Sequence, residues 1–329
     1  MKASTELILR HEIAGREDGP HVLVLAGVHG DEYEPMAACG ELHARLAAQL
    51  QKGRITLVPN ANPTAYVSTG RYGDDGLDMA RICPGKPDGS SSERAAYELS
   101  GLIRSADYLI DLHTGGVMYD ISPLAGYMLH ENQAVLDIQR EMAFAFDLPV
   151  VWGTDPLPQG RTLSVARDAG IPAIYLEYGG GTGFRPHVAT AYVEGVLNVL
   201  RLWEMVPGAA TRNNAGKQFW VEDIRPDSGF LQGKMPAPAD GIFIAGTTLG
   251  TLVKKGERVG HILDPATGNS TQIQADADGL VFLLRQIVKV KKGEALGGIL
   301  PISKPGSVTI GFDGIGKENN GRQPAFKNH

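Results

Sequence analysis

Between residue 21 and about residue 205, short apolar runs rich in β-branched residues alternate with longer amphipathic stretches. This alternation is typical of strands and helices that follow one another in α/β order. Because the connections between parallel strands are long, the pattern predicts an α/β fold with a mostly parallel or mixed sheet and helices on both faces. We expect strands at 21–28, 54–59, 108–113, 127–129 and 173–177, and helices at 34–50, 92–103 and 188–203.

The chain changes character after residue 205, and a second domain starts near residue 212. The stretch PGAATRNNAGK at 207–217 is typical of a linker, and after it the apolar runs are short and separated by Gly, Pro and Asp turns. We therefore predict a catalytic domain over residues 1–211 and a β-rich C-terminal domain over residues 212–329. The tail at 304–329 is polar and Gly-rich, and we assign it no function.

The predicted second domain contains an internal repeat. The triplet Ala-Asp-Gly occurs at 239–241 and at 277–279, and LVKKGERVGHIL at 252–263 recurs as KVKKGEALGGIL at 289–300. Two such copies resemble the halves of a biotinyl/lipoyl-type flattened β-barrel. Such barrels attach a cofactor to a lysine on the hairpin between the halves, but the hairpin here, DPATGNST, has no lysine. We therefore favour a structural or active-site-covering domain over a cofactor carrier.

The charge balance and the cysteine content exclude several classes of function. A formal net charge of -6 and a pI near 5.9 leave no basic surface of the kind that nucleic acids or anionic lipids require. The apolar runs are shorter than the roughly 20 residues of a membrane-spanning helix, and MKASTELILR lacks a secretory apolar segment, so we expect a cytoplasmic protein. Cys39 and Cys83 have no CxxC partner, so histidine and carboxylate side chains must hold any metal.

Candidate metal ligands follow two of the predicted strands. His29 and Glu32 lie three residues apart in AGVHGDE, directly after an apolar strand, and His113 ends the strand IDLH before a glycine turn. Because ligands bind at the carboxyl ends of strands in parallel α/β sheets, we expect these side chains to meet. Two histidines and a glutamate form a zinc set with a fourth position left for water, so the sequence predicts one Zn²⁺ per chain. Asp111 shares a strand face with His113 and is placed to orient its imidazole or to steady the site electrostatically.

A third predicted strand ends on a candidate acid/base residue. Glu177 closes AIYLE and precedes the glycine-rich loop YGGGTG. Hydrolysis at a zinc site needs a base that takes a proton from water and passes it to the leaving nitrogen, a role that we assign to Glu177 rather than a structural ion pair. Arg71 and Arg81 offer guanidinium groups to a substrate carboxylate or an oxyanion, unless they are only solvated loop charges. The remaining histidines considered, His21, His43, His130, His187 and His261, lack such neighbours and are interpreted as structural.

Together these motifs resemble the succinylglutamate desuccinylase/aspartoacylase family, which is related to the zinc carboxypeptidases. The resemblance covers nearly the whole chain. It rests on His29-Gly30-Asp31-Glu32, Asn62-Pro63, Arg71, Asp78-Met79-Ala80-Arg81, Pro84-Gly85, Asp111-Leu112-His113-Thr114-Gly115, Glu177 before a glycine loop, and the terminal β-rich domain.

The resemblance implies a role for each matched residue. His29, Glu32 and His113 correspond to the zinc ligands, and Glu177 to the general acid/base. In the same way it implies that Arg71 polarises the scissile carbonyl, that Arg81 clamps the substrate carboxylate, and that Asn62 takes part in substrate binding.

One position departs from the family pattern. Ala80 stands where the family commonly has the asparagine of an Asp-x-Asn-Arg motif, so the amide hydrogen bond to a substrate carboxylate is missing. Arg161 and Arg185 are further candidates for an anion contact, although neither lies in a motif that we can match. The loop after Glu177 and the overall length are similar to the branch that includes N-acetyl-diaminobutyrate deacetylases.

The sequence thus predicts a zinc-dependent amidohydrolase, a deacylase that uses metal-activated water to cleave the amide bond of a small N-acetyl or N-succinyl amino acid. Two alternatives stay open: a zinc carboxypeptidase that acts on peptides, and a non-catalytic metal-binding protein of the same fold. The expected partner is a small molecule rather than nucleic acid or membrane, and a homo-oligomer is compatible with the sequence.

Overall fold

A computed structural model describes residues 7–214, 217–301 and 308–312, and its centre is a 12-stranded mixed sheet. Next to one another lie β1 (His11–Ala14), β3 (Lys52–Val58), β2 (Glu17–Leu25), β4 (Tyr108–His113), β7 (Ala173–Gly180), β5 (Tyr119–Met128), β6 (Val150–Thr154), β8 (Phe219–Asp223) and β16 (Val308–Phe312). Strands β3, β2, β4 and β7 are parallel, whereas β5 is antiparallel to β7 and parallel to β6. The predicted mixed α/β sheet is therefore confirmed.

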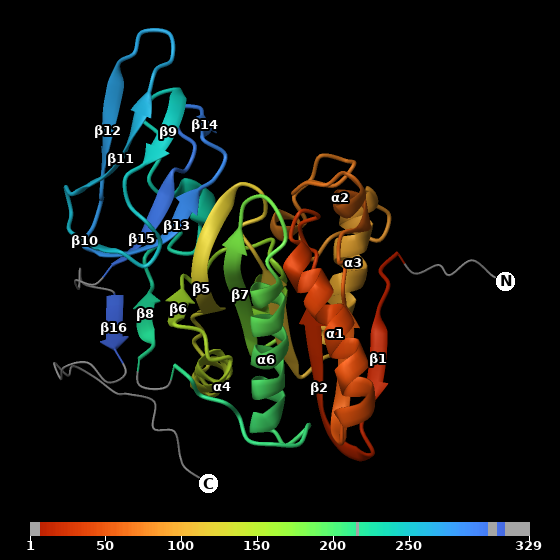
Figure 1. Ribbon diagram of the computed structural model, residues 1–329. Helices are drawn as coiled ribbons and strands as arrows, with labels where there is room; N and C mark the ends of the chain where they lie inside the picture. Colours follow the sequence, from red (N-terminus) through yellow and green to blue (C-terminus); the bar gives the residue numbers. More distant parts are fainter. Residues whose placement is uncertain (1–6, 215–216, 302–307, 313–329) are drawn as a thin grey trace.

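Helices cover both faces of this sheet (Figure 1). One face packs against α1 (Tyr33–Gln49), α4 (Gln133–Ala145) and α6 (Pro186–Leu202), and the other against α3 (Ser91–Arg104) and α5 (Thr162–Asp168). The apolar residues of α1 and α6 recur at helical spacing and are buried in one core cluster, which explains why these helices lie together. A short helix, α2 (Pro63–Val67), follows β3.

The C-terminal part of the chain forms an antiparallel sheet of its own and also extends the main sheet. The separate four-stranded sheet has the order β12 (Ser270–Gln274), β11 (Arg258–Leu263), β9 (Gly241–Ala245) and β14 (Lys289–Val290). In contrast, β13 (Gly279–Arg285) pairs with β5 and with β15 (Gly297–Pro301), and β8 pairs with β6. The hydrogen-bonded sheet therefore crosses the boundary that we predicted at residue 212.

The internal repeat appears as two strand sets that exchange partners. The first copy contributes β9, β10 (Leu252–Val253) and β11, and the second contributes β13, β14 and β15. Strand β10 pairs with β13 of the other copy, and β14 pairs with β9. The backbone N–H of Lys255 donates to Asp278 Oδ1 at 2.6 Å, and that of Lys292 donates to Asp240 Oδ1 at 2.8 Å. Each Ala-Asp-Gly triplet thus caps the Lys-Lys-Gly-Glu turn of the other copy.

The predicted elements are found, but with different lengths. The helices expected at 34–50, 92–103 and 188–203 are α1, α3 and α6, whereas the strand expected at 127–129 is only the end of the ten-residue β5. Most of the tail at 304–329 lies outside the described residues. Across the described ranges, no helix combines the length and the apolar character needed to cross a membrane.

Candidate active site

Three neighbouring parallel strands end at the same edge of the sheet and carry the predicted site residues. In the register of these strands, Leu25 of β2 lies beside Asp111 of β4, and His113 at the end of β4 lies beside Glu177 of β7. The turn that leaves β2 contains His29 and Glu32, and Glu32 immediately precedes α1. Strand register therefore brings together residues that are more than 140 positions apart in the sequence.

Glycine 30 allows the turn after β2 to pass close to another backbone segment. A Cβ atom on Gly30 would lie 2.0 Å from the backbone carbonyl of Ala65, which is in α2. The N–H of Gly30 also donates to the carbonyl of Gly70 at 2.9 Å. Only a residue without a side chain fits between His29 and Asp31, so the close approach of this turn to α2 requires glycine at position 30.

We expect Gly30→Ala to disturb the site through the backbone. The new methyl group overlaps main-chain atoms that cannot rotate away, so the free energy of unfolding should fall by about 1–3 kcal/mol and metal affinity should fall with it. Urea denaturation and zinc titration measure the two effects. Gly40→Ala is the control, because nothing lies within 4 Å of a Cβ placed at that helical position; equal stability of the two variants would contradict the expectation.

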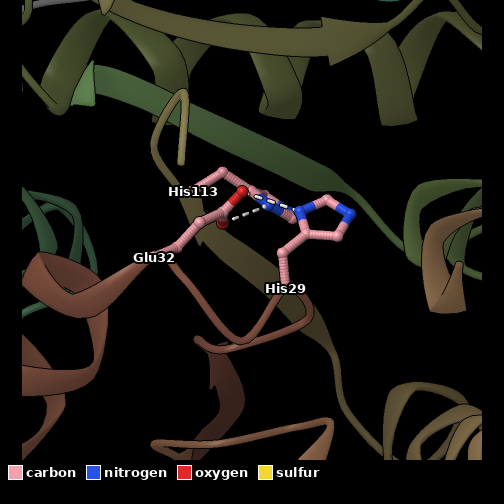
Figure 2. A group of neighbouring side chains, drawn as sticks. All are labelled: His29, Glu32 and His113. Atoms are coloured by element: carbon pink, nitrogen blue, oxygen red, sulfur yellow. Dashed lines mark hydrogen bonds and ion pairs between the residues drawn. The ribbon is translucent and has the colours of Figure 1, made fainter. Parts of the chain in front are cut away.

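Two histidines and one glutamate form a buried cluster of metal-ligand atoms. His29, Glu32 and His113 are 4%, 2% and 8% exposed, and one donor atom from each lies within 4.8 Å of the others. Nδ1 of His29 is 2.7 Å from Oε1 of Glu32, and Nδ1 of His113 is 2.9 Å from Oε2. Figure 2 shows the carboxylate turned toward both imidazoles. This donor set fits a divalent ion such as zinc, with room for a further ligand.

Each ionisable group in this cluster changes the pKa of its neighbours. Burial alone would raise the pKa of Glu32, but the neighbouring His29 and His113 outweigh it and lower the pKa of Glu32 to about 2. Burial likewise opposes protonation of His113, yet the carboxylates of Asp111 and Glu32 raise its pKa well above the ordinary value. A metal ion that binds here takes the place of protons held between these groups.

A second carboxylate lies behind each imidazole. Nε2 of His29 is 3.3 Å from Oδ1 of Asp78, and Nε2 of His113 is 3.2 Å from Oδ1 of Asp111. Asp78 also accepts a hydrogen bond from Nε of Arg71 at 2.8 Å. Carboxylates in this position fix the ring orientation and leave Nδ1 free to face the metal, as the predicted role of Asp111 requires.

Glu177 faces the same cavity with a carboxyl group that has no fixed partner. Its Oε2 is buried, and the described part of the chain provides neither a hydrogen bond to that atom nor a cation within ion-pair distance. Burial raises the pKa of Glu177 to about 8; His113 opposes this shift and Glu32 adds to it. An unpaired carboxyl group with a raised pKa is suited to general acid/base work and does not fit the structural ion pair considered above.

A cavity of about 720 Å³ surrounds these groups and is closed partly by the C-terminal region. Residues after position 212 therefore form part of the wall of this cavity. The predicted site residues His29, Glu32, Arg71, Arg81, His113 and Glu177 all line the cavity, and so do Gly229, Phe230, Leu231, Gln232, Arg285, Glu294 and Ala295 from the C-terminal region.

Three guanidinium groups line the cavity and make it suitable for an anionic ligand. Arg71, Arg81 and Arg161 all line it, and burial together with the positive charge of Arg71 lowers the pKa of both Arg81 and Arg161. Arg81 donates to Oε1 of Gln232 at 3.0 Å, and its guanidinium lies 5.8 Å from the ring centre of Phe230. In the described residues, no carboxylate lies within ion-pair distance of Arg161, so this guanidinium is the most available of the three.

Other candidates lie away from the cavity. Asn62 is fully buried, and its side chain caps α2 by accepting the N–H of Ala65 at 3.3 Å. Arg185 donates its backbone N–H to Glu34 at 2.9 Å, which ties the chain after the glycine loop to α1. Neither Asn62 nor Arg185 lines the cavity, and neither do His21, His43, His130, His187 and His261.

Tyr175 and Thr162 are among the cavity residues that sequence reasoning did not find. Tyr175 lies two positions before Glu177 on the same strand face, so strand alternation was a usable signal for it. Thr162 follows Arg161 at the start of the short helix α5, and nothing in the local sequence pattern marks it.

Comparison with known proteins confirms the resemblance predicted from the motifs. The profile described as "Succinylglutamate desuccinylase/Aspartoacylase catalytic domain" matches residues 18–203, more than half of the chain. The N-alpha-acetyl-L-2,4-diaminobutyric acid deacetylase of Halomonas elongata is 28% identical over 295 residues, which cover 88% of this chain and 84% of that protein.

Solved structures show that the similarity extends to the C-terminal region. A succinylglutamate desuccinylase/aspartoacylase from Rhodobacter sphaeroides has a TM-score of 0.79 at 27% identity, covering 89% of this chain and 88% of that one. The product-bound ectoine utilization protein EutE (DoeB) from Ruegeria pomeroyi also has a TM-score of 0.79, at 26% identity, covering 88% of this chain and 87% of that one.

Proposed function

The chain belongs to the succinylglutamate desuccinylase/aspartoacylase family of metal-dependent deacylases, and from this premise we propose that it is a zinc-dependent hydrolase that cleaves the amide bond of a small N-acyl amino acid. The observation that carries the proposal is the unpartnered carboxyl group of Glu177 in the same cavity as the buried cluster of His29, Glu32 and His113. An N-acetyl group is the first candidate for the acyl part, because the Halomonas relative is a deacetylase.

The side chains of the cavity divide the reaction between them. His29, Glu32 and His113 are the residues that would hold the ion, whose chemistry is to polarise a carbonyl and to lower the pKa of water. Glu177 accepts a proton from the attacking water and returns it to the nitrogen that leaves when the carbon–nitrogen bond breaks. The Nη groups of Arg71, which faces the cavity while its Nε holds Asp78, donate to the oxygen that becomes negative in the transition state.

The substrate carboxylate has two candidate partners. Arg81 is the residue that the family motif implies, but its guanidinium is already bonded to Gln232. Arg161 lines the same cavity, and among the described residues no carboxylate lies within ion-pair distance of it, while Asp155 and Asp227 act on it from farther away. An arginine that is desolvated and lacks an internal counter-ion is stabilised by an incoming carboxylate, because the pair forms two parallel charge-assisted hydrogen bonds. We propose that Arg161 binds the carboxylate together with Arg81.

We expect Arg161→Met to raise KM for the substrate by about 10–100-fold, because hydrogen bonds to charged groups contribute roughly 1.5–3 kcal/mol. The value of kcat should change much less, since the carboxylate is bound equally in the ground and transition states. Steady-state kinetics separates the two constants. Arg104→Met, at the exposed end of α3, is the matched control. An unchanged KM, or a loss confined to kcat, would remove Arg161 from substrate binding.

A hydrolysis screen tests the proposed function itself. Zinc-loaded protein is incubated with N-acetyl, N-succinyl and N-formyl amino acids, including N-acetyl-2,4-diaminobutyrate, and free amine is measured. We expect turnover of one acyl class well above the others, since a few wall residues decide which acyl group fits. Zinc binding without turnover on the whole panel would overturn the proposal and favour a non-catalytic protein, whereas trimming of peptides would favour a carboxypeptidase.

The C-terminal wall of the cavity counts against a carboxypeptidase. A peptidase needs an open cleft for a long substrate, but Phe230, Arg285 and Glu294 border the cavity that holds the metal cluster. Arg285 donates hydrogen bonds to three backbone carbonyls and to Glu294, and these bonds hold this part of the cavity wall in place. Small substrates are therefore favoured.

A further inference from the structure

We propose that Thr162 is a positioning residue of the metal centre, which holds Asp111 so that Asp111 orients the imidazole of His113. The inference rests on the metal site of the proposed function. The three residues come from one strand and one helix: Asp111 and His113 lie on β4, and Thr162 is the first residue of α5.

The geometry forms a continuous chain of contacts. Nε2 of His113 lies 3.2 Å from Oδ1 of Asp111, and Oδ2 of Asp111 accepts the hydroxyl of Thr162 at 2.5 Å. Asp111 is 0% exposed and Thr162 is 3% exposed, so water does not compete for either contact. Because side chains alternate along a strand, Asp111 and His113 share one face of β4, and α5 packs on that region through Thr162.

Asp111 depends on Thr162 because it has few other partners. Apart from the imidazole of His113, Oδ1 of Asp111 has no hydrogen-bond partner within the described ranges, and Oδ2 receives only the threonine hydroxyl. A buried carboxylate that loses a donor pays a desolvation penalty and is free to rotate toward another one. Rotation of Asp111 would release the ring of His113 and spread the orientations of its Nδ1, the atom that faces Glu32.

The support of His113 differs from that of His29 in charge. Asp78, behind His29, is held by the cationic Arg71, whereas Asp111, behind His113, is held by a neutral hydroxyl. A neutral donor fixes the direction of the carboxylate without compensating its charge. The full negative charge of Asp111 then acts on the imidazole and makes it a stronger electron donor to the metal. Thr162 therefore fixes the orientation of Asp111, while the negative charge of Asp111 remains available to act on the imidazole of His113.

Zinc affinity of the metal-free protein tests this role without any assay of hydrolysis. We compare wild type, Thr162→Val, which keeps the shape but loses the hydroxyl, and Thr162→Ser, which restores it, by competition with a chromophoric chelator. Loss of an outer partner of a metal ligand typically lowers affinity 10–100-fold. We expect Thr162→Val to bind zinc about 10-fold more weakly, and Thr162→Ser to return affinity to near that of wild type. The visible spectrum of the Co²⁺ form should shift in Thr162→Val only.

A double-mutant cycle decides whether Thr162 acts through Asp111. In an Asp111→Asn background, Thr162→Val should weaken zinc binding much less than it does alone, because the path is already broken. Circular dichroism verifies that each variant is folded. Wild-type affinity and an unshifted Co²⁺ spectrum in Thr162→Val, failure of the serine to restore binding, or an undiminished effect in the Asp111→Asn background would each overturn the inference. Zinc binding by a wild type that cleaves no N-acyl amino acid would overturn the proposed function alone.

Discussion

Replacing Glu177 by glutamine is expected to lower kcat by about 1,000-fold, within the roughly 10²–10⁴-fold that a positioned acid/base group contributes. The amide has nearly the size and shape of the carboxyl group, but it cannot accept a proton from water or return one to the leaving nitrogen. KM and zinc content should stay close to wild type, because Glu177 is not one of the three clustered metal-ligand residues. Amine release from the preferred substrate and zinc analysis of the same sample measure both.

Glu194→Gln is the matched control for that experiment. Glu194 is a 46% exposed partner of Arg45 on the surface of α6, so the same chemical change there should leave kcat unaltered. Full activity in Glu177→Gln would show that the proton moves through another group. Loss of zinc together with activity would instead make Glu177 a structural part of the metal centre, and either result would contradict its assignment as acid/base.

The cluster of His29, Glu32 and His113 could be predicted because each of its parts is local in the sequence. His29 and Glu32 occupy a single turn, and His113 ends an uninterrupted apolar strand. Once three strands are recognised as parallel neighbours, their carboxyl ends lie at one edge of the sheet, where the structure pairs His113 with Glu177. Short motifs and strand direction were therefore sufficient to predict which residues form the candidate metal site and that Glu177 lies beside it.

The missing elements of the sheet have sequences without a clear local signal. Strand β5 reads YDISPLAGYM, in which Asp120, Pro123 and Gly126 interrupt the apolar alternation, so only its last residues were expected as a strand. Its direction, antiparallel to β7, is set by pairing with distant segments. Strand β6 and helix α5 have only five and seven residues, too few for a period to be distinguished.

The walls of the cavity could not be predicted, because they form by contacts between distant parts of the chain. Gln232 reaches Arg81 across 151 residues, and Glu294 lines the cavity beside Arg285, whose strand β13 pairs with β5. Arg161 and Arg185 were both candidates for an anion contact, and only tertiary structure separates them, because Arg161 lines the cavity and Arg185 does not. Substrate preference therefore depends on tertiary contacts, while the ligand cluster depends on short motifs.

Removal of the metal should affect hydrolysis and folding differently. Oε1 and Oε2 of Glu32 accept hydrogen bonds from His29 and His113, so contacts within the ligand set hold its side chains in place. We therefore expect treatment with a chelator to leave the protein folded while hydrolysis falls below detection, and one equivalent of zinc to restore it. Hydrolysis assayed before chelation, after chelation and after zinc addition tests this, with His43→Ala, an exposed histidine outside the cavity, as the control that should behave as wild type.

The free energy of unfolding should rise with the logarithm of the zinc concentration once zinc exceeds its dissociation constant. A ligand that binds only the folded state stabilises it by about 4 kcal/mol at 1,000 times its dissociation constant, so Tm should rise with added zinc and then flatten slowly. Glu32→Gln removes the charge that lies between the two imidazoles, and in that variant the zinc-dependent rise should largely disappear. Hydrolysis that persists after complete removal of zinc, or an equal rise of Tm in Glu32→Gln, would mean that this cluster is not the metal site on which activity depends.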